Sequence, residues 1–305
     1  MPFVAAAILT SDTLANGYVR LLEQVKYRQV MKKLIGGSVV PATCDFDTEV
    51  GSLELDERIL ETTDLKVDEW VCKDDLRQDW LSSELGPSYL DQDLPTEVTD
   101  NILLYLARIA ARNNEHNIWK GNFNPVDGST IGAQYTAFDG LLRLIVDSAP
   151  LAETTVTGAF TYDTSGNAIL DMLETLIQQA PDDIIGDPMT KIYMSRRSLF
   201  LLQRAMAGQV VTQGGFSPTF VGDPRPQIFM GYDIWTPAGF ADDVLLMSAK
   251  DNLVFGTDLE SDYNSATVVD MQQTDASRNV RMSMRFSGGT QFVDEDSLSI
   301  VRRSA

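Results

Sequence analysis

Apolar residues recur at two spacings along this chain of 305 residues, and each spacing predicts one kind of secondary structure. In residues 14–34, Leu14, Tyr18, Leu21 and other apolar side chains recur every three or four positions, which predicts an amphipathic helix. Gly36-Gly37 follows, and glycine readily adopts the left-handed conformation that ends a helix. We therefore expect a helical arm near the start of the chain.

Residues 38–80 carry the β-branched and aromatic side chains that favour extended structure. Two runs, SVVPATCDFDTEV and RILETTDLKVDEWVC, flank the segment GSLELDE, which predicts two antiparallel strands with a tip near residues 51–58. The pattern is too acidic for burial on both faces. We therefore expect a hairpin that protrudes from the body of the protein.

Pro95 predicts the start of a long helix, because the first helical position does not need the N–H that proline lacks. Arg108 and Arg112 lie towards the end of this helix, where the helix dipole favours cations. The helix is expected over about residues 96–116, and roughly 20 residues at ~1.5 Å each give a strut of roughly 30 Å. Its predicted apolar stripe consists of Val98, Ile102, Tyr105, Leu106 and Ile109.

The middle of the chain alternates between predicted helices and strands. A short helix is expected over residues 138–147, and an amphipathic helix follows Ser165 and ends at Pro181. A third helix follows Ser195, a plausible N-cap, and ends at Gly208. The remaining predicted elements are a buried strand at MTKIYMS, a long loop at residues 209–227, and strands at QIFMGYDIWTP, DVLLMSAK and NLVFGTD.

The last part of the chain is rich in strand patterns. ATVVDMQQ is strand-like, and NVRMSMRF alternates strictly, with Val280 and Met282 on one face and Arg281 and Ser283 on the other. Gly288-Gly289 predicts a turn, after which SLSIVR returns as a final strand. Together with the helices, this order predicts an α+β protein.

Charge is unevenly distributed along the chain, whose net charge is −20. Residues 44–100 contain 18 acidic and 4 basic residues (net −14), whereas residues 1–36 contain 5 basic and 2 acidic residues (net +3). The sequence lacks the surplus of Lys and Arg typical of DNA-binding proteins. We expect the basic arm and the acidic hairpin tip to dock against neighbouring copies, through Lys26, Arg28, Lys32, Lys33, Glu54, Asp56, Glu57 and Arg58.

The sequence offers no set of residues for catalysis, and we predict no enzymatic activity, no cofactor and no metal. His116 is the only histidine, there is no GxSxG or GxxxxGK[ST] motif, and no GxGxxG follows a strand. Cys44 and Cys72 do not form a CxxC pair, and the acidic group at residues 182–187 has the composition of a turn. No apolar run is long enough to span a bilayer and no basic residue precedes the first apolar stretch, so we expect cytoplasmic synthesis without membrane association.

The order of these elements resembles the major capsid proteins of tailed bacteriophages with the Hong Kong 97-like fold. ILETTDLKVDEWVCKDDLRQDW resembles the strand that leads out of the E-loop, NILLYLARIAARNNEHNIWKGN the spine helix, and AFDGLLRLI the helix that enters the axial domain. DNLVFGTDLESDYNSATVVD and MRFSGGTQFVDEDSLSIVR resemble the end of the axial domain and the closing strands. The resemblance covers residues 14–303 and implies an N-terminal arm (1–37), an E-loop hairpin (38–72), a peripheral domain (73–130 and 262–305) and an axial domain (131–261).

This resemblance implies a shell protein that assembles with itself, as pentamers and hexamers, around packaged double-stranded DNA that it does not recognise specifically. A fused scaffolding segment is not expected, which implies a separate scaffolding protein beside the portal, and cement or decoration proteins are further candidate partners. The expected location is the capsid of the virion, assembled in the cytoplasm of the host bacterium. The alternatives are an encapsulin-type nanocompartment shell, a tail or connector protein, and an enzyme.

Overall fold

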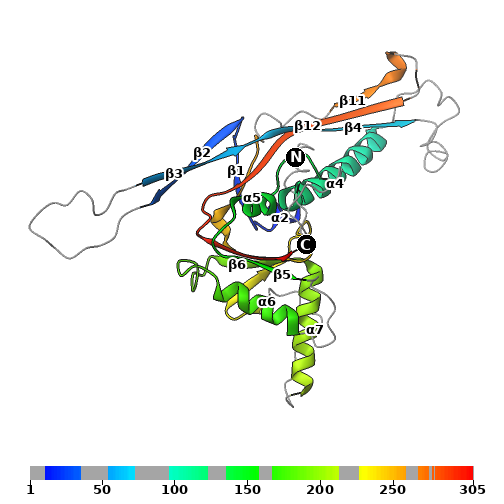
Figure 1. Ribbon diagram of the computed structural model, residues 1–305. Coiled ribbons are helices and arrows are strands. Elements are labelled where there is room, and N and C mark those ends of the chain that lie inside the picture. Colours follow the sequence, from blue (N-terminus) through cyan, green and yellow to red (C-terminus); the bar gives the residue numbers. More distant parts are fainter. Residues whose placement is uncertain are drawn as a thin grey trace, which may run out of the picture.

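The computed structural model describes two stacked halves of the subunit (Figure 1). The upper half contains a five-stranded sheet and the long helix α4, and the lower half contains a six-stranded sheet with helices α6 and α7. The described residues are 11–35, 54–72, 96–122, 135–157, 167–212, 227–258, 267–274, 277 and 279–304.

The fourteen-residue strand β12 (Asn279–Phe292) is the centre of the upper half. It pairs along ten positions with β4 (Thr63–Cys72), and on its other side with β11 (Thr267–Asp270) and β10 (Leu253–Gly256). Strand β1 (Arg20–Leu22) extends the sheet by pairing in parallel with β10. The predicted alternation of β12 is confirmed, because its apolar residues from Val280 to Phe286 are buried in turn while the residues between them are more exposed.

The predicted turn at Gly288-Gly289 is wrong, because β12 continues straight through both glycines. A Cβ atom on Gly289 would lie 2.1 Å from the backbone carbonyl oxygen of Glu61. The missing side chain therefore lets two backbones approach each other. Close approach of another backbone is a common reason for a glycine inside a strand.

Helix α4 (Thr96–Lys120) lies beside β12 and β4 (Figure 1) and is somewhat longer than predicted. Its described buried face carries small alanines followed by Ile118 and Trp119, both fully buried. Tyr105 is 64% exposed, so its place in the predicted core stripe is wrong. The side chains of Val98, Ile102 and Leu106 lie outside the described part of the structure.

The predicted helix over residues 14–34 is also wrong. Only one turn, α2 (Asp12–Ala15), is helical, and it is followed by β1 and by β2 (Arg28–Ile35). Gly17 and Gln24 both have φ of 65°, a conformation that interrupts a right-handed helix. Pairing of β1 with β10 and of β2 with β3 (Glu54–Glu61) supplies the backbone hydrogen bonds that a helix would have made internally.

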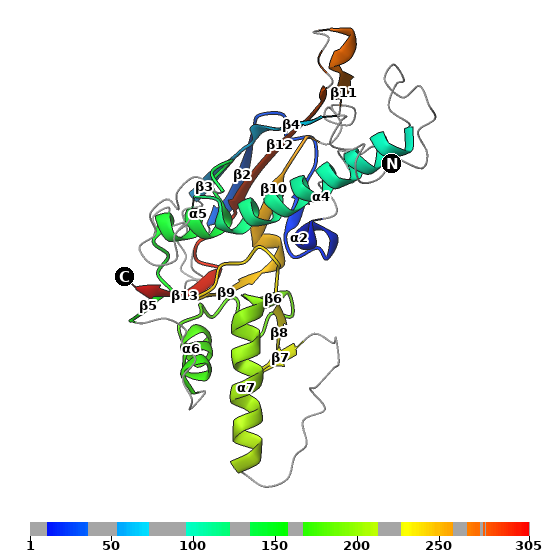
Figure 2. The same cartoon turned by 90° about the vertical axis from the view of Figure 1, so that its right-hand side faces the viewer.

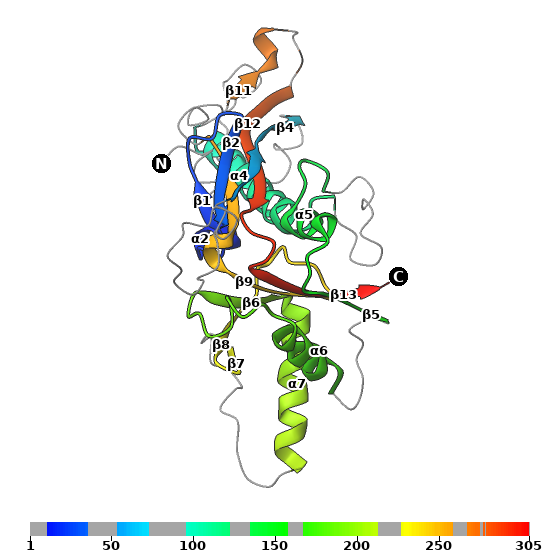
Figure 3. The same cartoon turned by 60° about the vertical axis from the view of Figure 1, so that its left-hand side comes forward.

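Helices cover one face of the sheet of the lower half, and the core shared with the upper half covers the other face. The strand order of this sheet is β5-β13-β9-β6-β8-β7, and α6 (Asn167–Gln178) and α7 (Arg196–Thr212) lie on the same side of it (Figure 3). The remaining bounds are Glu153–Thr157 for β5, Thr190–Met194 for β6, Gln227–Phe229 for β7, Tyr232–Trp235 for β8, Val244–Ala249 for β9, Leu298–Ser304 for β13 and Leu141–Ser148 for α5.

Most of the predicted elements of this region are confirmed. Ser195 caps α7 as predicted, since the Ser198 N–H donates to its Oγ at 3.1 Å, but the helix passes Gly208 and continues to Thr212. QIFMGYDIWTP forms two short strands around Met230 and Gly231 instead of one. Within the predicted loop, residues 209–212 belong to α7, and residues 213–226 lie outside the described part.

The lower sheet separates two hydrophobic clusters. Ile192 of β6, Leu245 and Met247 of β9 and Val301 of β13 pack with α6 and α7. Their neighbours on the other face, such as Tyr193, pack with α4, α5 and the start of the chain. Burial on both faces explains the continuous apolar run of β9, and it joins the two halves through one core.

The close approach at Gly289 gives a testable prediction. G289A should lower the free energy of unfolding by about 1–3 kcal/mol, because the added Cβ forces two backbones apart. Urea denaturation of the unassembled subunit measures this effect. G288A is the matched control, since a Cβ there would first meet the Phe255 side chain at 3.3 Å. Equal losses for both variants would contradict this role of Gly289.

Candidate assembly surface

A two-stranded hairpin extends from the upper half, and its strands differ from the predicted ones (Figure 1). Strand β2 pairs with β3, whereas β4 belongs to the long sheet. The predicted first strand, residues 38–50, lies outside the described residues. The expected tip residues Glu54, Asp56, Glu57 and Arg58 lie within strand β3.

Opposite charges face each other across this hairpin. Arg28 is paired with Glu61, Lys32 with Glu57 and Lys33 with Asp56. Opposite-charge pairs stabilise antiparallel strands, so the basic segment predicted as a separate arm is the partner strand of the acidic segment. Of the eight predicted assembly residues, seven lie in this hairpin, and Lys26 lies exposed just before β2.

The outer face of the hairpin alternates between charged and apolar rows. Arg28 and Glu61 form an ion pair at 3.1 Å, and each side chain is about half exposed. The next row contains Val30 and Ile59, which are 46% and 45% exposed. Exposed apolar side chains grouped on one face are typical of a surface that contacts another protein. The members of the outer face are Arg28, Val30, Lys32, Leu55, Glu57, Ile59 and Glu61.

The inner face anchors the hairpin to the acidic segment Asp294–Asp296, between β12 and β13. Lys33 donates to Asp294 and contacts Asp296 at 3.4 Å, and Arg58 donates to Glu295. The Arg58 guanidinium also lies 4.2 Å from the centre of the Phe292 ring. We call this set of contacts the hairpin anchor.

Electrostatics of the anchor favour the charged forms of both partners. Burial alone would raise the pKa of Asp294, but hydrogen bonds from Lys33, Ser297 and the Asp296 backbone outweigh it and hold the pKa below the ordinary value. Burial alone would lower the pKa of Lys33, yet the hydrogen bonds to Asp294 and Asp296 raise it. The ion pair is therefore complete at neutral pH.

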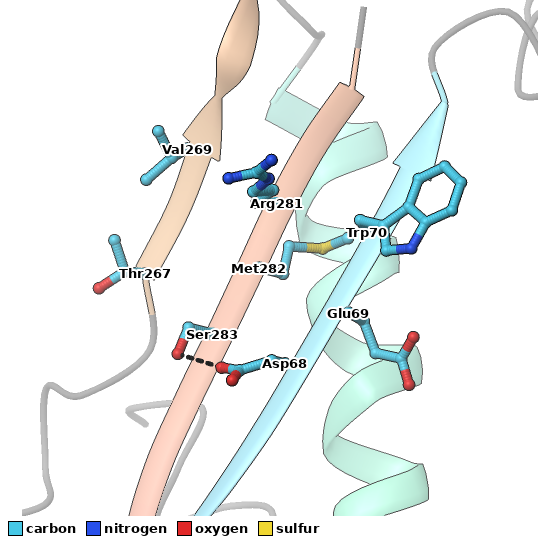
Figure 4. Close-up of a pocket in the computed structure, with 8 residues that line it drawn as sticks. All are labelled: Asp68, Glu69, Trp70, Thr267, Val269, Arg281, Met282 and Ser283. Carbon is cyan, nitrogen blue, oxygen red and sulfur yellow. Dashed lines mark hydrogen bonds between the residues drawn. The ribbon is translucent and has the colours of Figure 1, made fainter. Parts of the chain in front are cut away.

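The outer face of the long sheet contains a groove of about 320 Å³ between β11, β12 and β4 (Figure 4). Arg281 lies between Val269 and Trp70, which are 42% and 65% exposed. One row along, Ser283 donates to Asp68 at 2.8 Å. The groove thus combines an apolar rim with a cation and an acid, opposite the face that packs with α4.

The sequence reading missed the groove and the anchor. The alternation of residues 279–286 identified the buried face of β12 but gave no partner for its other face. The run VDEDS, which contains Asp294, Glu295 and Asp296, is the one signal that could have indicated a partner for the basic segment. Pairing between positions more than 200 residues apart is not readable from local patterns.

In the ranges that the structure describes, no group of three or more His, Cys, Asp or Glu side chains is placed to hold a metal ion. No helix within the described residues combines the length and apolar character needed to cross a bilayer.

Comparison with solved structures gives extensive matches at low sequence identity. A chain of the satellite phage P4 procapsid including size determination (Sid) protein is 13% identical, with a TM-score of 0.60 over 99% of this chain and 90% of that chain. A chain of Mycobacterium phage Ogopogo is 12% identical, with a TM-score of 0.56 over 97% of this chain and 92% of that chain. A chain of the Cyanophage A-1(L) capsid asymmetric unit is 12% identical, with a TM-score of 0.54 over 96% and 93%.

This chain has the Hong Kong 97-like capsid fold. No protein-family model and no curated protein sequence matches it, so the likeness lies in structure alone. The α+β class predicted from the sequence is confirmed by this fold. At such low identity, the Hong Kong 97-like fold fixes the arrangement of elements, while the hairpin face, its anchor and the groove are built from this chain's own residues.

The hairpin anchor gives a prediction about pH. A carboxyl group whose pKa is lowered in the folded state stabilises that state above its unfolded pKa, and the contribution disappears as pH falls through the folded pKa. For Asp294, whose ordinary value is 3.8, the anchor should therefore weaken below that value. Hydrogen exchange of the β2 and β3 backbone amides, followed as pH is lowered, measures this loss of stability.

D294N provides the matched variant for this prediction. It keeps the shape of the side chain but removes the charge, which should cost the hairpin about 1–2 kcal/mol of local stability at neutral pH. Its amide exchange should respond less to acid in that range than exchange in the unsubstituted chain, since only the contacts of Glu295 and Asp296 remain. Unchanged exchange in D294N would show that the ion pair does not hold the hairpin.

Proposed function

We propose that this chain is the major capsid protein of a tailed bacteriophage. It assembles with itself, as hexamers and pentamers, into an icosahedral shell that encloses the genome, and it has no enzymatic activity. The observation that carries the proposal is the match over nearly the whole chain to procapsid and capsid chains. The particles named in these matches are a phage procapsid, a cyanophage capsid and the capsid of a GTA particle, which favours a phage shell over a nanocompartment.

The described elements support an assignment of the regions of this fold. We assign β2 and β3 to the E-loop hairpin, α4 to the spine helix and the lower sheet to the axial domain. The arm then ends before Arg28, not at residue 37 as expected. The peripheral domain should end before Leu298, because β13 pairs with β9 and β5 of the lower sheet.

Two surfaces of the subunit suit contacts between copies. The outer face of the hairpin and the groove both contain rows of residues two positions apart along a strand, about 7 Å per row. On the hairpin, an apolar row lies beside the Lys32–Glu57 row, and in the groove, the Trp70–Val269 rim lies beside Asp68. Contact between the two surfaces of neighbouring copies would bring apolar rows together and would place the Lys32–Glu57 row beside the Ser283–Asp68 row of the groove.

The wider biology follows from the same proposal. The shell would be part of the virion and would assemble in the host cytoplasm. A separate scaffolding protein, a portal and cement or decoration proteins are proposed partners, and the packaged double-stranded DNA is enclosed without specific recognition. The net charge of −20 supports weak contact with DNA, because like charges repel.

Electron microscopy of the purified full chain, with size-exclusion chromatography, tests the proposed function. Closed shells, pentamers or hexamers are expected. A monomer or dimer that stays unassembled with its scaffolding protein present, or that carries a bound cofactor, would overturn it.

The V30T/I59T double variant tests the hairpin face. Threonine keeps the β-branched shape, so the hairpin should fold, but the loss of exposed apolar area should raise the subunit concentration needed for assembly by about tenfold. L151T is the matched control, because Leu151 is 97% exposed outside the hairpin and groove. Assembly of V30T/I59T at the normal concentration would exclude this face as a contact.

Salt should help assembly. Each copy carries a net charge of −20, and about 1 M salt shortens the Debye length to ~3 Å, which screens the repulsion between copies. Light scattering across a salt series should therefore rise earlier as salt increases. Shells that dissociate with rising salt would instead show that ion pairs between subunits dominate the contacts.

A further inference from the structure

The segment Ser11–Val19 lies at the junction of the two halves of the subunit. Its helical turn, α2, is placed between α4 above and β6 below (Figure 2). Ser11, Thr13 and Val19 are at most 3% exposed, although the segment is short and polar. We call this segment the junction brace.

The brace is bonded to α4 through a buried carboxylate. The Thr13 N–H donates to Glu115 Oε2 at 2.8 Å, and the Thr13 hydroxyl donates to Glu115 Oε1 at 2.5 Å. The same hydroxyl accepts a hydrogen bond of 2.6 Å from the indole N–H of Trp119. Thr13 therefore satisfies polar groups on two successive turns of α4.

The brace is bonded equally to the lower half. The Asp12 carboxylate accepts from Arg196 at the start of α7 and from the Ala238 N–H, both at 3.0 Å. The Tyr193 hydroxyl of β6 donates to the Tyr18 carbonyl oxygen at 2.8 Å. The Tyr18 ring also packs on Trp235 of β8, with 4.9 Å between ring centres.

Glu115 couples these two sets of contacts. Its Oε1 also accepts from the Gly239 N–H at 3.2 Å, and a Cβ on Gly239 would lie 2.1 Å from the Glu115 carbonyl oxygen. Burial raises the pKa of Glu115, and the bonds from Thr13 and Gly239 only partly offset this effect. Without the brace, the buried Glu115 carboxylate would keep only one of its three hydrogen-bond donors, the Gly239 N–H. A buried charge whose hydrogen bonds are incomplete is costly. The hydrogen bonds that join the brace, α4 and the turn at Gly239 therefore form or break together.

We propose that the junction brace is a conformational lock that fixes the angle between the two halves of the subunit. Apolar packing also joins the halves, but the hydrophobic effect is non-directional. The hydrogen bonds of Asp12, Thr13 and Tyr18 are directional, and they connect α4 to β6, to α7 and to the turn at Ala238. A lock of this kind selects one subunit shape from a range that the core allows.

The lock would act on the size of the shell, a consequence that rests on the proposed function. In a closed shell of many copies, small changes in subunit shape change the angles between neighbours and thus the curvature. Engagement of the brace would therefore narrow the distribution of shell diameters.

T13V with T13S as control tests the lock. Valine has the same shape but removes the hydroxyl that bonds Glu115 and Trp119, whereas serine keeps it. Spin labels at Y105C on α4 and F200C on α7, both exposed positions, report the distance between the halves by electron paramagnetic resonance, with Cys44 and Cys72 replaced by serine. In T13V the width of the distance distribution should increase about twofold, and in T13S it should match the unsubstituted chain.

The outcomes separate the lock from the proposed function. An unchanged distance distribution in T13V would overturn the lock, whether or not shells form. Shells of T13V with a wider range of diameters would support it, and shells with the normal range would remove its link to curvature.

If T13V does not fold, D12N, which changes a partly exposed side chain, replaces it under the same criteria. If the unsubstituted chain forms no shells, the proposed function fails, while the distance measurement on the subunit still decides on the lock.

Discussion

The burial of one face of β12 in the core that also contains α4 is the constraint on which the rest of the structure depends. Met284 and Phe286 of β12 share this core with Ala107, Ile118 and Trp119 of α4. Because side chains alternate along a strand, burial of this face places Arg281 and Ser283 on the opposite face, where the groove forms. The same strand leads into the acidic segment Asp294–Asp296, so it also positions the partner of the hairpin.

The sequence was most informative where a pattern is long and local. The strict alternation of residues 279–286 was readable, because one buried face imposes a period on the residues themselves. The helix after Pro95 was found as an element, although its predicted stripe includes the exposed Tyr105. Residues 14–34 failed for the opposite reason. Their apolar spacing resembles a helix, but the segment is divided among a turn and two strands whose partners lie elsewhere in the chain.

The candidate surface was only partly predictable. The charges of the hairpin residues were recognised, but the ion pairs that Lys33 and Arg58 make within the subunit were not. Glycine was ambiguous in the same way, since Gly288-Gly289 allows either a turn or a close approach of backbones. Such choices are decided by distant residues, for which a local pattern contains no information.

The hairpin anchor gives the subunit a mechanical property. The eight-residue strands β2 and β3 are each roughly 26 Å long at ~3.3 Å per residue, and ion pairs fix them on one side to the 294–296 segment. Lys33 lies two residues from Ile35, the end of β2, so the anchor fixes the strands near their far ends and not at their base. The described hairpin is therefore supported at both ends, by its continuation into β4 and by the ion pairs with the 294–296 segment. A rotation at its base would have to break these ion pairs.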